Sequence, residues 1–212
     1  MAISIEAQIK RQFAKIFTAD DWRVFKLLAG YYIKTATRLR KRDVDIVDTF
    51  KLLARNAQKR LFIGVGCELL VKASFLKQGY GINKIDFQEM KRRSLGQPAL
   101  PYRIGAVAPD LLIETDTFSF NQILDQLRKM PVFAVASRQE RQIMMRGFKI
   151  AKVFRNKEGH VATLWHDFDP TNYSDVEHAL VLFYRVAFAE QLKIQFSVER
   201  NEQDLFEITP LR

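Results

Sequence analysis

The sequence has few of the residues that bind metal ions or cross-link a protein. It contains one cysteine and three histidines among 212 residues. One thiol excludes an internal disulfide and a zinc site built from several cysteines. The cysteine, Cys67, lies in the apolar run LFIGVGCELL, where we expect a small buried side chain. We therefore expect a protein of a reducing cytoplasm that uses no metal and no other cofactor.

Long apolar segments are also missing. The longest apolar run, LFIGVGCELLVKASFL, carries Glu68 and Lys72 and is too short to span a membrane. The first residues, MAISIEAQIKRQF, lack the apolar stretch of a signal peptide. No glycine-rich phosphate loop, nucleophile elbow or zinc motif occurs, so the enzyme classes that use them rank low. We expect a soluble cytoplasmic protein with no membrane attachment.

Acidic residues are outnumbered by basic ones. The chain has 34 Lys and Arg against 24 Asp and Glu, which gives a formal net charge of +10. Such an excess attracts polyanions, of which nucleic acid is the commonest. A basic, well-solvated surface without such a partner would give the same composition. With 48% hydrophobic and 27% charged residues, the chain is typical of a folded globular protein.

Glycine and proline are scarce outside one segment. Of nine glycines and six prolines, two glycines and three prolines fall in GQPALPYRIGAVAPD. This stretch has no sustained period, whereas apolar residues recur at helical spacing through most of the remaining chain. We therefore expect an all-α fold. It would be a bundle of five to six helices, with a long irregular insert around residues 80–118 that can hold a short strand.

Capping signals place the boundaries of these helices. Three serines, each followed three positions later by Glu or Gln, form capping boxes: Ser119, Ser137 and Ser174. The predicted helices cover residues 5–17, 18–42, 45–78, 119–130, 137–154 and 174–196. We expect a single domain, residues 1–212, that comprises an N-terminal helical extension over 1–42, a core over 45–195 and a loosely attached polar tail over 197–212.

A polar island, RNKEGH, interrupts the apolar segment KIAKVFRNKEGHVATLWHDF. His160 can take and give protons at neutral pH, because an unperturbed histidine has a pKa near 6.5. Arg155 matches phosphate oxygens with its planar fork, and Asn156 can orient an imidazole or a ribose hydroxyl. Together these side chains suit cleavage of an RNA backbone without a metal.

The spacing of the two charged groups leaves their geometry open. Arg155 and His160 differ by ~140° around a regular helix. They can converge through the long arginine side chain, through a break at Gly159, or across a subunit boundary. An exposed helix turn with a solvated arginine and histidine is the alternative interpretation of the same pattern.

The island resembles the R-x4-H motif of HEPN domains, in which the residue after Arg is often Asn, Asp or His. A second stretch, RNAQKRLFIGVGCELLVKASFLKQGYG, resembles an earlier HEPN helix whose typical pattern is E-L-L-x-K-A. Glu68, Leu69, Leu70, Lys72 and Ala73 match that pattern in order. The resemblance covers roughly residues 45–195.

This resemblance implies a helical bundle with the motif in a late helix that one more apolar helix follows. Many HEPN proteins are metal-independent endoribonucleases in toxin–antitoxin, abortive-infection or other phage-defence systems. They commonly form homodimers in which two motifs build one composite cleft. Carried over, Arg155 and His160 would be catalytic and Asn156 supportive, and the partners would be RNA, a second copy and an antitoxin or regulatory protein. The tyrosine that one branch carries two residues after the motif histidine is Ala162 here, which argues against control by its modification.

Further basic residues are candidate RNA contacts. Those in the clusters RLRKR and KRR and before the motif are Arg38, Arg40, Lys41, Arg42, Arg92, Arg93 and Lys152. Arg138, Arg141, Arg146 and Lys149 place more positive charge in the stretch that leads to the motif. Ordinary solvated helix faces would carry the same residues.

Glu68 and Lys72 are four residues apart, so they can pair on one helix. In so apolar a segment they need polar partners, and they could face Arg155 or His160. Two other functions stay open. One is a non-catalytic HEPN module that binds RNA or a protein, and the other is a basic helical scaffold that binds nucleic acid.

Overall fold

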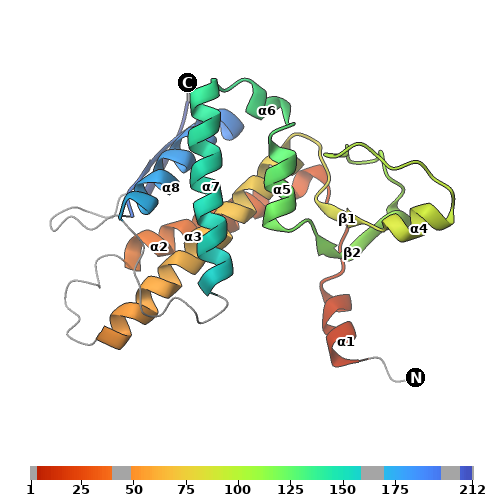
Figure 1. Ribbon diagram of the computed structural model, residues 1–212, viewed down its shortest axis with the longest axis horizontal. Coiled ribbons are helices and arrows are strands. Elements are labelled where there is room, and N and C mark those ends of the chain that lie inside the picture. The colour runs from red at the N-terminus through yellow and green to blue at the C-terminus, as the bar shows by residue number, and fades with distance from the viewer. Residues whose placement is uncertain (1–3, 40–48, 159–169, 197–205, 212) are drawn as a thin grey trace.

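A computed structural model describes residues 4–39, 49–158, 170–196 and 206–211. Helices dominate these ranges, as Figure 1 shows, so the prediction of a largely α fold is confirmed. The fold is not all-α, because two small antiparallel sheets accompany the helices. In one, β1 (Asn83–Ile85) pairs with β2 (Leu112–Thr117), and in the other, β3 (Glu190–Ile194) pairs with β4 (Phe206–Pro210).

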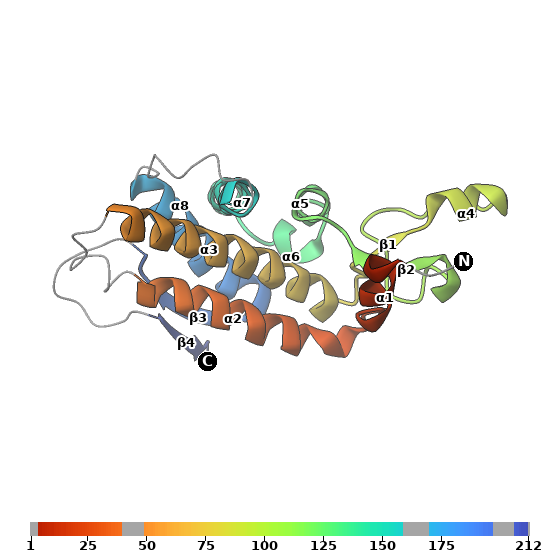
Figure 2. The ribbon, with the colours of Figure 1, turned by 90° about the horizontal axis from the view of Figure 1, so that it is seen from below.

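The long helix α3 (Thr49–Lys77) is central to the bundle. Figure 2 shows it between α2 (Trp22–Leu39) on one side and α7 (Arg138–Glu158) on the other, and α8 (Pro170–Phe183) packs beside α7. Its side chains are buried on several faces, including Cys67, which is inaccessible to solvent as predicted. The helix ends at Lys77, and Gly79 follows with a φ of +75°, as the sequence signals predicted.

Two glycines let α3 approach its neighbours closely. A Cβ at Gly64 would lie 2.6 Å from Arg155 Cβ and 2.7 Å from the Ala151 carbonyl oxygen of α7. A Cβ at Gly66 would lie 2.6 Å from Ile33 Cγ1 of α2. With any larger residue at either position, the two helices could not approach each other this closely. Close backbone packing at Gly64 therefore sets where Arg155 of α7 lies relative to α3.

The first helix is shorter than predicted. The helix α1 (Ile5–Gln12) ends five residues early, and the chain then runs beside the insert to a short 3-10 turn, η1 (Ala19–Asp21). The buried side chain of Asn83 explains the difference. Its Oδ1 accepts a hydrogen bond from Phe17 N at 2.9 Å, and its Nδ2 donates to the Lys15 carbonyl at 2.8 Å. These bonds hold residues 15–17 in a non-helical path.

The insert is more ordered than an irregular loop. Besides β1 and β2 it contains α4 (Phe87–Arg92) and a 3-10 turn, η3 (Pro109–Leu111). The buried ring of Tyr102 packs against Gly81, and its hydroxyl donates to the Asn83 carbonyl at 2.9 Å. Figure 1 shows the insert and α1 extending to one side of the bundle.

Two of the three predicted capping boxes are confirmed. Ser119 and Gln122 cap α5 (Phe120–Leu127), which the short helix α6 (Pro131–Ala134) follows, and Ser137 and Glu140 cap α7. The third is wrong, because α8 begins at Pro170 and Ser174 lies inside it. Proline suits the first helical position, where no hydrogen bond to its nitrogen is needed.

The predicted last helix ends eight residues early. After α8 the chain makes one π-helical segment, η4 (Tyr184–Phe188), and Ala189 then adopts a left-handed conformation with φ +55°. Leu192 and Ile194 are buried while their neighbours face outward, which is the alternation of a strand. Residues 206–210, expected in a loose tail, form β4 on this strand. No helix in the described ranges combines the length and the apolar character needed to cross a bilayer.

Candidate functional site

The guanidinium of Arg155 is held by a buried carboxylate. Arg155 lies near the end of α7, and its Nε is 2.7 Å from Glu68 Oε2 on α3. The arginine side chain is 41% exposed, whereas the glutamate side chain is 8% exposed. The close approach of the two helices at Gly64, one turn before Glu68, makes this contact possible. Glu68 therefore holds Arg155 on its buried side, while part of the arginine side chain remains exposed to solvent.

The other oxygen of Glu68 binds a second cation. Glu68 Oε1 lies 2.7 Å from Lys72 Nζ, which also donates to Thr117 Oγ1 of β2 at 2.9 Å. One buried carboxylate thus bridges two cations, one at each oxygen. Of the two residues that could face the motif, Glu68 contacts Arg155, and Lys72 reaches it only through Glu68. The contacts connect α7, α3 and the strand that closes the insert.

This arrangement suits recognition of an anion. Two cations share one carboxylate, so the cluster formed by Arg155, Glu68 and Lys72 carries a net positive charge. The contact at Nε restricts the long arginine side chain before any ligand arrives, which lowers the entropy lost on binding. A guanidinium at the protein surface can receive phosphate oxygens through its fork.

Asn156 lies within the described residues, whereas His160 does not. Asn156 is exposed on α7, and its Oδ1 accepts a long hydrogen bond from Arg155 Nη1 at 3.4 Å. His160 lies outside the described residues, as do Arg40, Lys41 and Arg42. The convergence of Arg155 and His160 therefore stays a prediction.

A basic groove runs along α7 before Arg155. It has a volume of about 860 Å³ and lies among α5, α6, α7 and the start of α8. Half of its lining residues are basic: Arg128, Arg138, Arg141, Arg146 and Lys149. Arg146 is paired with Asp175 at 2.8 Å, while the other four form no ion pair within the described ranges. Cations that line one groove and have no ion-pair partner among the described residues favour a polyanionic ligand.

The groove includes one basic residue, Arg128, that the sequence did not indicate. Helical spacing places Arg138, Arg141 and Lys149 in one stripe on α7, which the sequence shows directly. Arg128 follows α5 and joins them only through the packing of α5 and α6 against α7. Lys152, one turn further, donates to Asn121 Oδ1 of α5 at 3.0 Å. This bond connects the end of the stripe to α5.

The other predicted RNA contacts that the structure describes, Arg38, Arg92 and Arg93, do not line this groove. Arg92 and Arg93 both contact the Glu89 carboxylate, at 2.7 and 2.6 Å, and Arg93 also contacts Asp110 at 2.5 Å. Arg92 is the last residue of α4 and Arg93 follows it; Figure 1 shows α4 away from α7, at the outer end of the insert. The carboxylates of Glu89 and Asp110 therefore reduce the positive charge that α4 presents. Arg38 is exposed in the last turn of α2.

Scans against protein-family models, curated proteins and solved structures found no match. Among the described residues, no group of three His, Cys, Asp or Glu side chains is placed to hold a metal ion.

Proposed function

We propose that the protein is a metal-independent endoribonuclease of the HEPN type. The observation that carries this proposal is the contact between Arg155 and Glu68. It brings together the two stretches that resemble HEPN domains, R-x4-H and E-L-L-x-K-A, which lie far apart in the sequence. A resemblance without common ancestry would not require these stretches to meet.

The proposed reaction uses the ribose 2′-hydroxyl as the nucleophile. The 2′-oxygen attacks the adjacent phosphorus and the bond to the 5′-oxygen breaks, which leaves a 2′,3′-cyclic phosphate and a 5′-hydroxyl. Arg155 would bind the non-bridging oxygens and stabilise the charge that grows on them in the transition state. His160 would move the proton, either from the 2′-hydroxyl or to the leaving oxygen. Asn156 would support one of these groups.

Dimerisation would bring together motif residues that point in different directions from one helix. In a homodimer, Arg155 of one copy can lie beside His160 of a second copy, and the two motifs would build one composite cleft. The basic groove on α7 would lead the RNA backbone to that cleft. An endoribonuclease of this kind suits a toxin or phage-defence role in the cytoplasm, under the control of an antitoxin or a regulatory protein.

The test is cleavage of RNA in EDTA by the purified full chain. We expect products with cyclic phosphate ends, and no cleavage when a 2′-deoxynucleotide replaces the residue before the cut. His160→Ala should lose the activity and keep its fold, while Arg11→Ala, which changes an exposed charge on α1, should retain it. Cleavage that requires Mg²⁺, or that survives in His160→Ala, would contradict the proposal.

The basic groove favours one second candidate, a non-catalytic module that binds RNA. The groove has four basic residues that form no ion pair in the described ranges, and they would serve this function without His160: Arg128, Arg138, Arg141 and Lys149. Salt-dependent RNA binding by a wild-type protein that never cleaves would select this candidate.

A further inference from the structure

The outer face of α2 presents a row of uncovered apolar side chains. Val24, Leu27, Leu28 and Tyr31 are between 44% and 74% exposed. Their spacing is that of one helix face, at positions i, i+3, i+4 and i+7. The opposite face of the same helix, with Ala29 and Ile33, is fully buried. A helix with apolar residues on both faces has a second surface that another element can cover.

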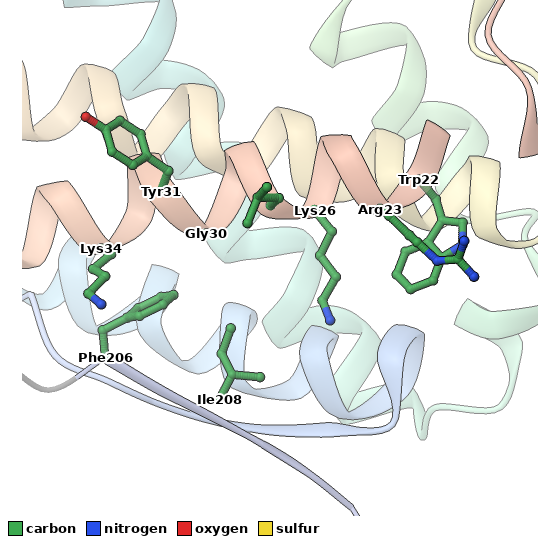
Figure 3. Close-up of a pocket in the computed structure, with 9 residues that line it drawn as sticks. Trp22, Arg23, Lys26, Gly30, Tyr31, Lys34, Phe206 and Ile208 are labelled. Carbon is green, nitrogen blue, oxygen red and sulfur yellow. The ribbon is translucent and has the colours of Figure 1, made fainter. Parts of the chain in front are cut away.

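A groove lies beside this row, between α2 and β4. Its volume is about 520 Å³, within the range of roughly 300–1,000 Å³ that is typical of ligand sites. Figure 3 shows Phe206 and Ile208 rising from β4 toward α2, with Lys26 and Lys34 extending from α2 into the same space. The groove therefore has apolar walls and basic groups at its rim.

Gly30 keeps the middle of this groove open. Glycine is unfavourable inside a helix, so its presence needs a reason. A Cβ at Gly30 would have Phe206 Cζ as its nearest neighbour, at an ordinary contact distance of 3.9 Å. At Gly64 and Gly147 the corresponding distances are 2.6 and 2.4 Å. Packing among the described residues thus requires glycine at 64 and 147 but not at 30, where it leaves space.

The two ends of the groove carry positive charge. Arg23 and Lys34 are eleven residues apart on α2, about 16 Å along the helix axis. Neither forms an ion pair with any residue that the structure describes, although Arg23 lies over the Trp22 ring at 5.6 Å. Lys26, between them, is paired with Glu190 at 2.5 Å. Two cations that have no acidic partner in the described part of the chain thus flank an apolar centre.

We propose that this groove binds an amphipathic helix of a partner protein, with acidic side chains in its first and last turns. A length of about 16 Å corresponds to three helical turns, and helices that lie in grooves bind through apolar anchors at i, i+3, i+4 and i+7. Acidic residues at both ends would meet Arg23 and Lys34 together. The inference is independent of RNA cleavage.

Two other occupants fit the charges less well. A fatty acid has one anionic head and would reach only one of the two cations. In a two-fold contact between copies of this chain, an antiparallel α2 pair would place Arg23 opposite Lys34 of the other copy. Like charges would then face each other at both ends. An acidic partner is the occupant that satisfies both ends.

The test uses two labelled synthetic helices of eighteen residues with the same leucines at i, i+3, i+4 and i+7. One carries glutamates in its first and last turns, and the other carries lysines. We expect the acidic peptide to bind the full-length protein at least tenfold more tightly in fluorescence anisotropy. The difference should shrink as salt rises.

Matched variants assign the binding to the groove. Gly30→Leu fills the groove and should weaken the acidic peptide at least tenfold, while Gly30→Ala should bind it like the wild type. Arg23→Glu combined with Lys34→Glu should reverse the preference between the peptides. Circular dichroism and thermal unfolding establish that each variant is folded.

Several results would overturn the proposal. These are binding of neither peptide, equal binding of both, and binding that Gly30→Leu leaves unchanged. Self-association that Gly30→Leu abolishes, measured by light scattering, would identify a second copy as the occupant. Displacement of a bound apolar dye by myristate, with no preference between the peptides, would identify a single-headed amphiphile.

Discussion

Arg155 Nε lies 2.7 Å from Glu68 Oε2, and the same carboxylate contacts Lys72 through its other oxygen. A buried glutamate thus holds one half-exposed arginine and one buried lysine. Because each cation depends on the same acid, the three residues should respond very differently to truncation.

Glu68→Ala should be the most destabilising of the three substitutions. It leaves the buried Lys72 ammonium without its carboxylate, and such a loss costs about 3–5 kcal/mol. Lys72→Ala and Arg155→Ala each leave Glu68 with one cation, so both should cost less. Urea unfolding of the three variants measures the order. A Glu68→Ala variant as stable as Lys72→Ala would contradict the shared-carboxylate arrangement.

Gly64→Ala should damage both stability and the site. The added methyl group would lie 2.6 Å from Arg155 Cβ, so α7 must move, at a cost of about 1–3 kcal/mol. The movement displaces Arg155, and RNA cleavage should fall with it. Gly30→Ala is the matched control, since its added methyl group would meet only Phe206 Cζ, at an ordinary contact distance of 3.9 Å, and should stabilise α2 by about 1 kcal/mol. The midpoint of thermal unfolding should fall for Gly64→Ala and rise for Gly30→Ala.

Charge reversal in the basic groove on α7 should weaken RNA binding. Arg141→Glu combined with Lys149→Glu removes two phosphate contacts and should lower the slope of log affinity against log salt by about 2. Binding is measured in the His160→Ala background, so that cleavage does not interfere. Arg11→Glu combined with Lys91→Glu makes the same charge change on α1 and α4. An equal loss in this control would show that only net charge matters.

The cap of α7 should give a pH-dependent contribution to stability. The Ser137 backbone N–H, then Arg185 and then the Ser137 hydroxyl hold the pKa of Glu140 below its ordinary value. The folded state therefore binds this proton less readily than the unfolded state. The stability from Glu140 is present above its ordinary pKa and is lost as the pH falls through the folded-state pKa.

The matched variant for this effect is Glu140→Gln. The difference in unfolding free energy between wild type and Glu140→Gln should be largest near neutral pH and should shrink as the solution becomes acidic. Urea unfolding at a series of pH values measures it. A difference that stays constant with pH would show that the carboxylate charge does not contribute.

Local signals predicted the helices well because their causes are local. The caps at Ser119 and Ser137 and the stop at Gly79 depend on residues a few positions apart. The early end of α1 depends on Asn83, far along the chain, and the strand after Ala189 depends on pairing with residues 206–210. These distant partners carry no signal within the segments that they reshape.

The candidate site shows the same division. The charged stripe on α7 could be predicted from helical spacing, and the pairing of Glu89 with Arg92 and Arg93 could have been inferred from their i, i+3 and i, i+4 separations. Arg128 joins the groove only through tertiary packing. The contact between Glu68 and Arg155 requires α3 and α7 to approach at Gly64, and a single sequence gives no distance between helices.

The most direct test is the initial rate of RNA cleavage in EDTA by the wild type and by Arg155→Ala, at equal concentrations of folded protein. If Arg155 stabilises the charge on the phosphate in the transition state, the variant should cleave about a hundredfold more slowly or worse. An unchanged rate would mean that Arg155 is only a surface partner of Glu68, and that the R-x4-H site is not the catalytic centre.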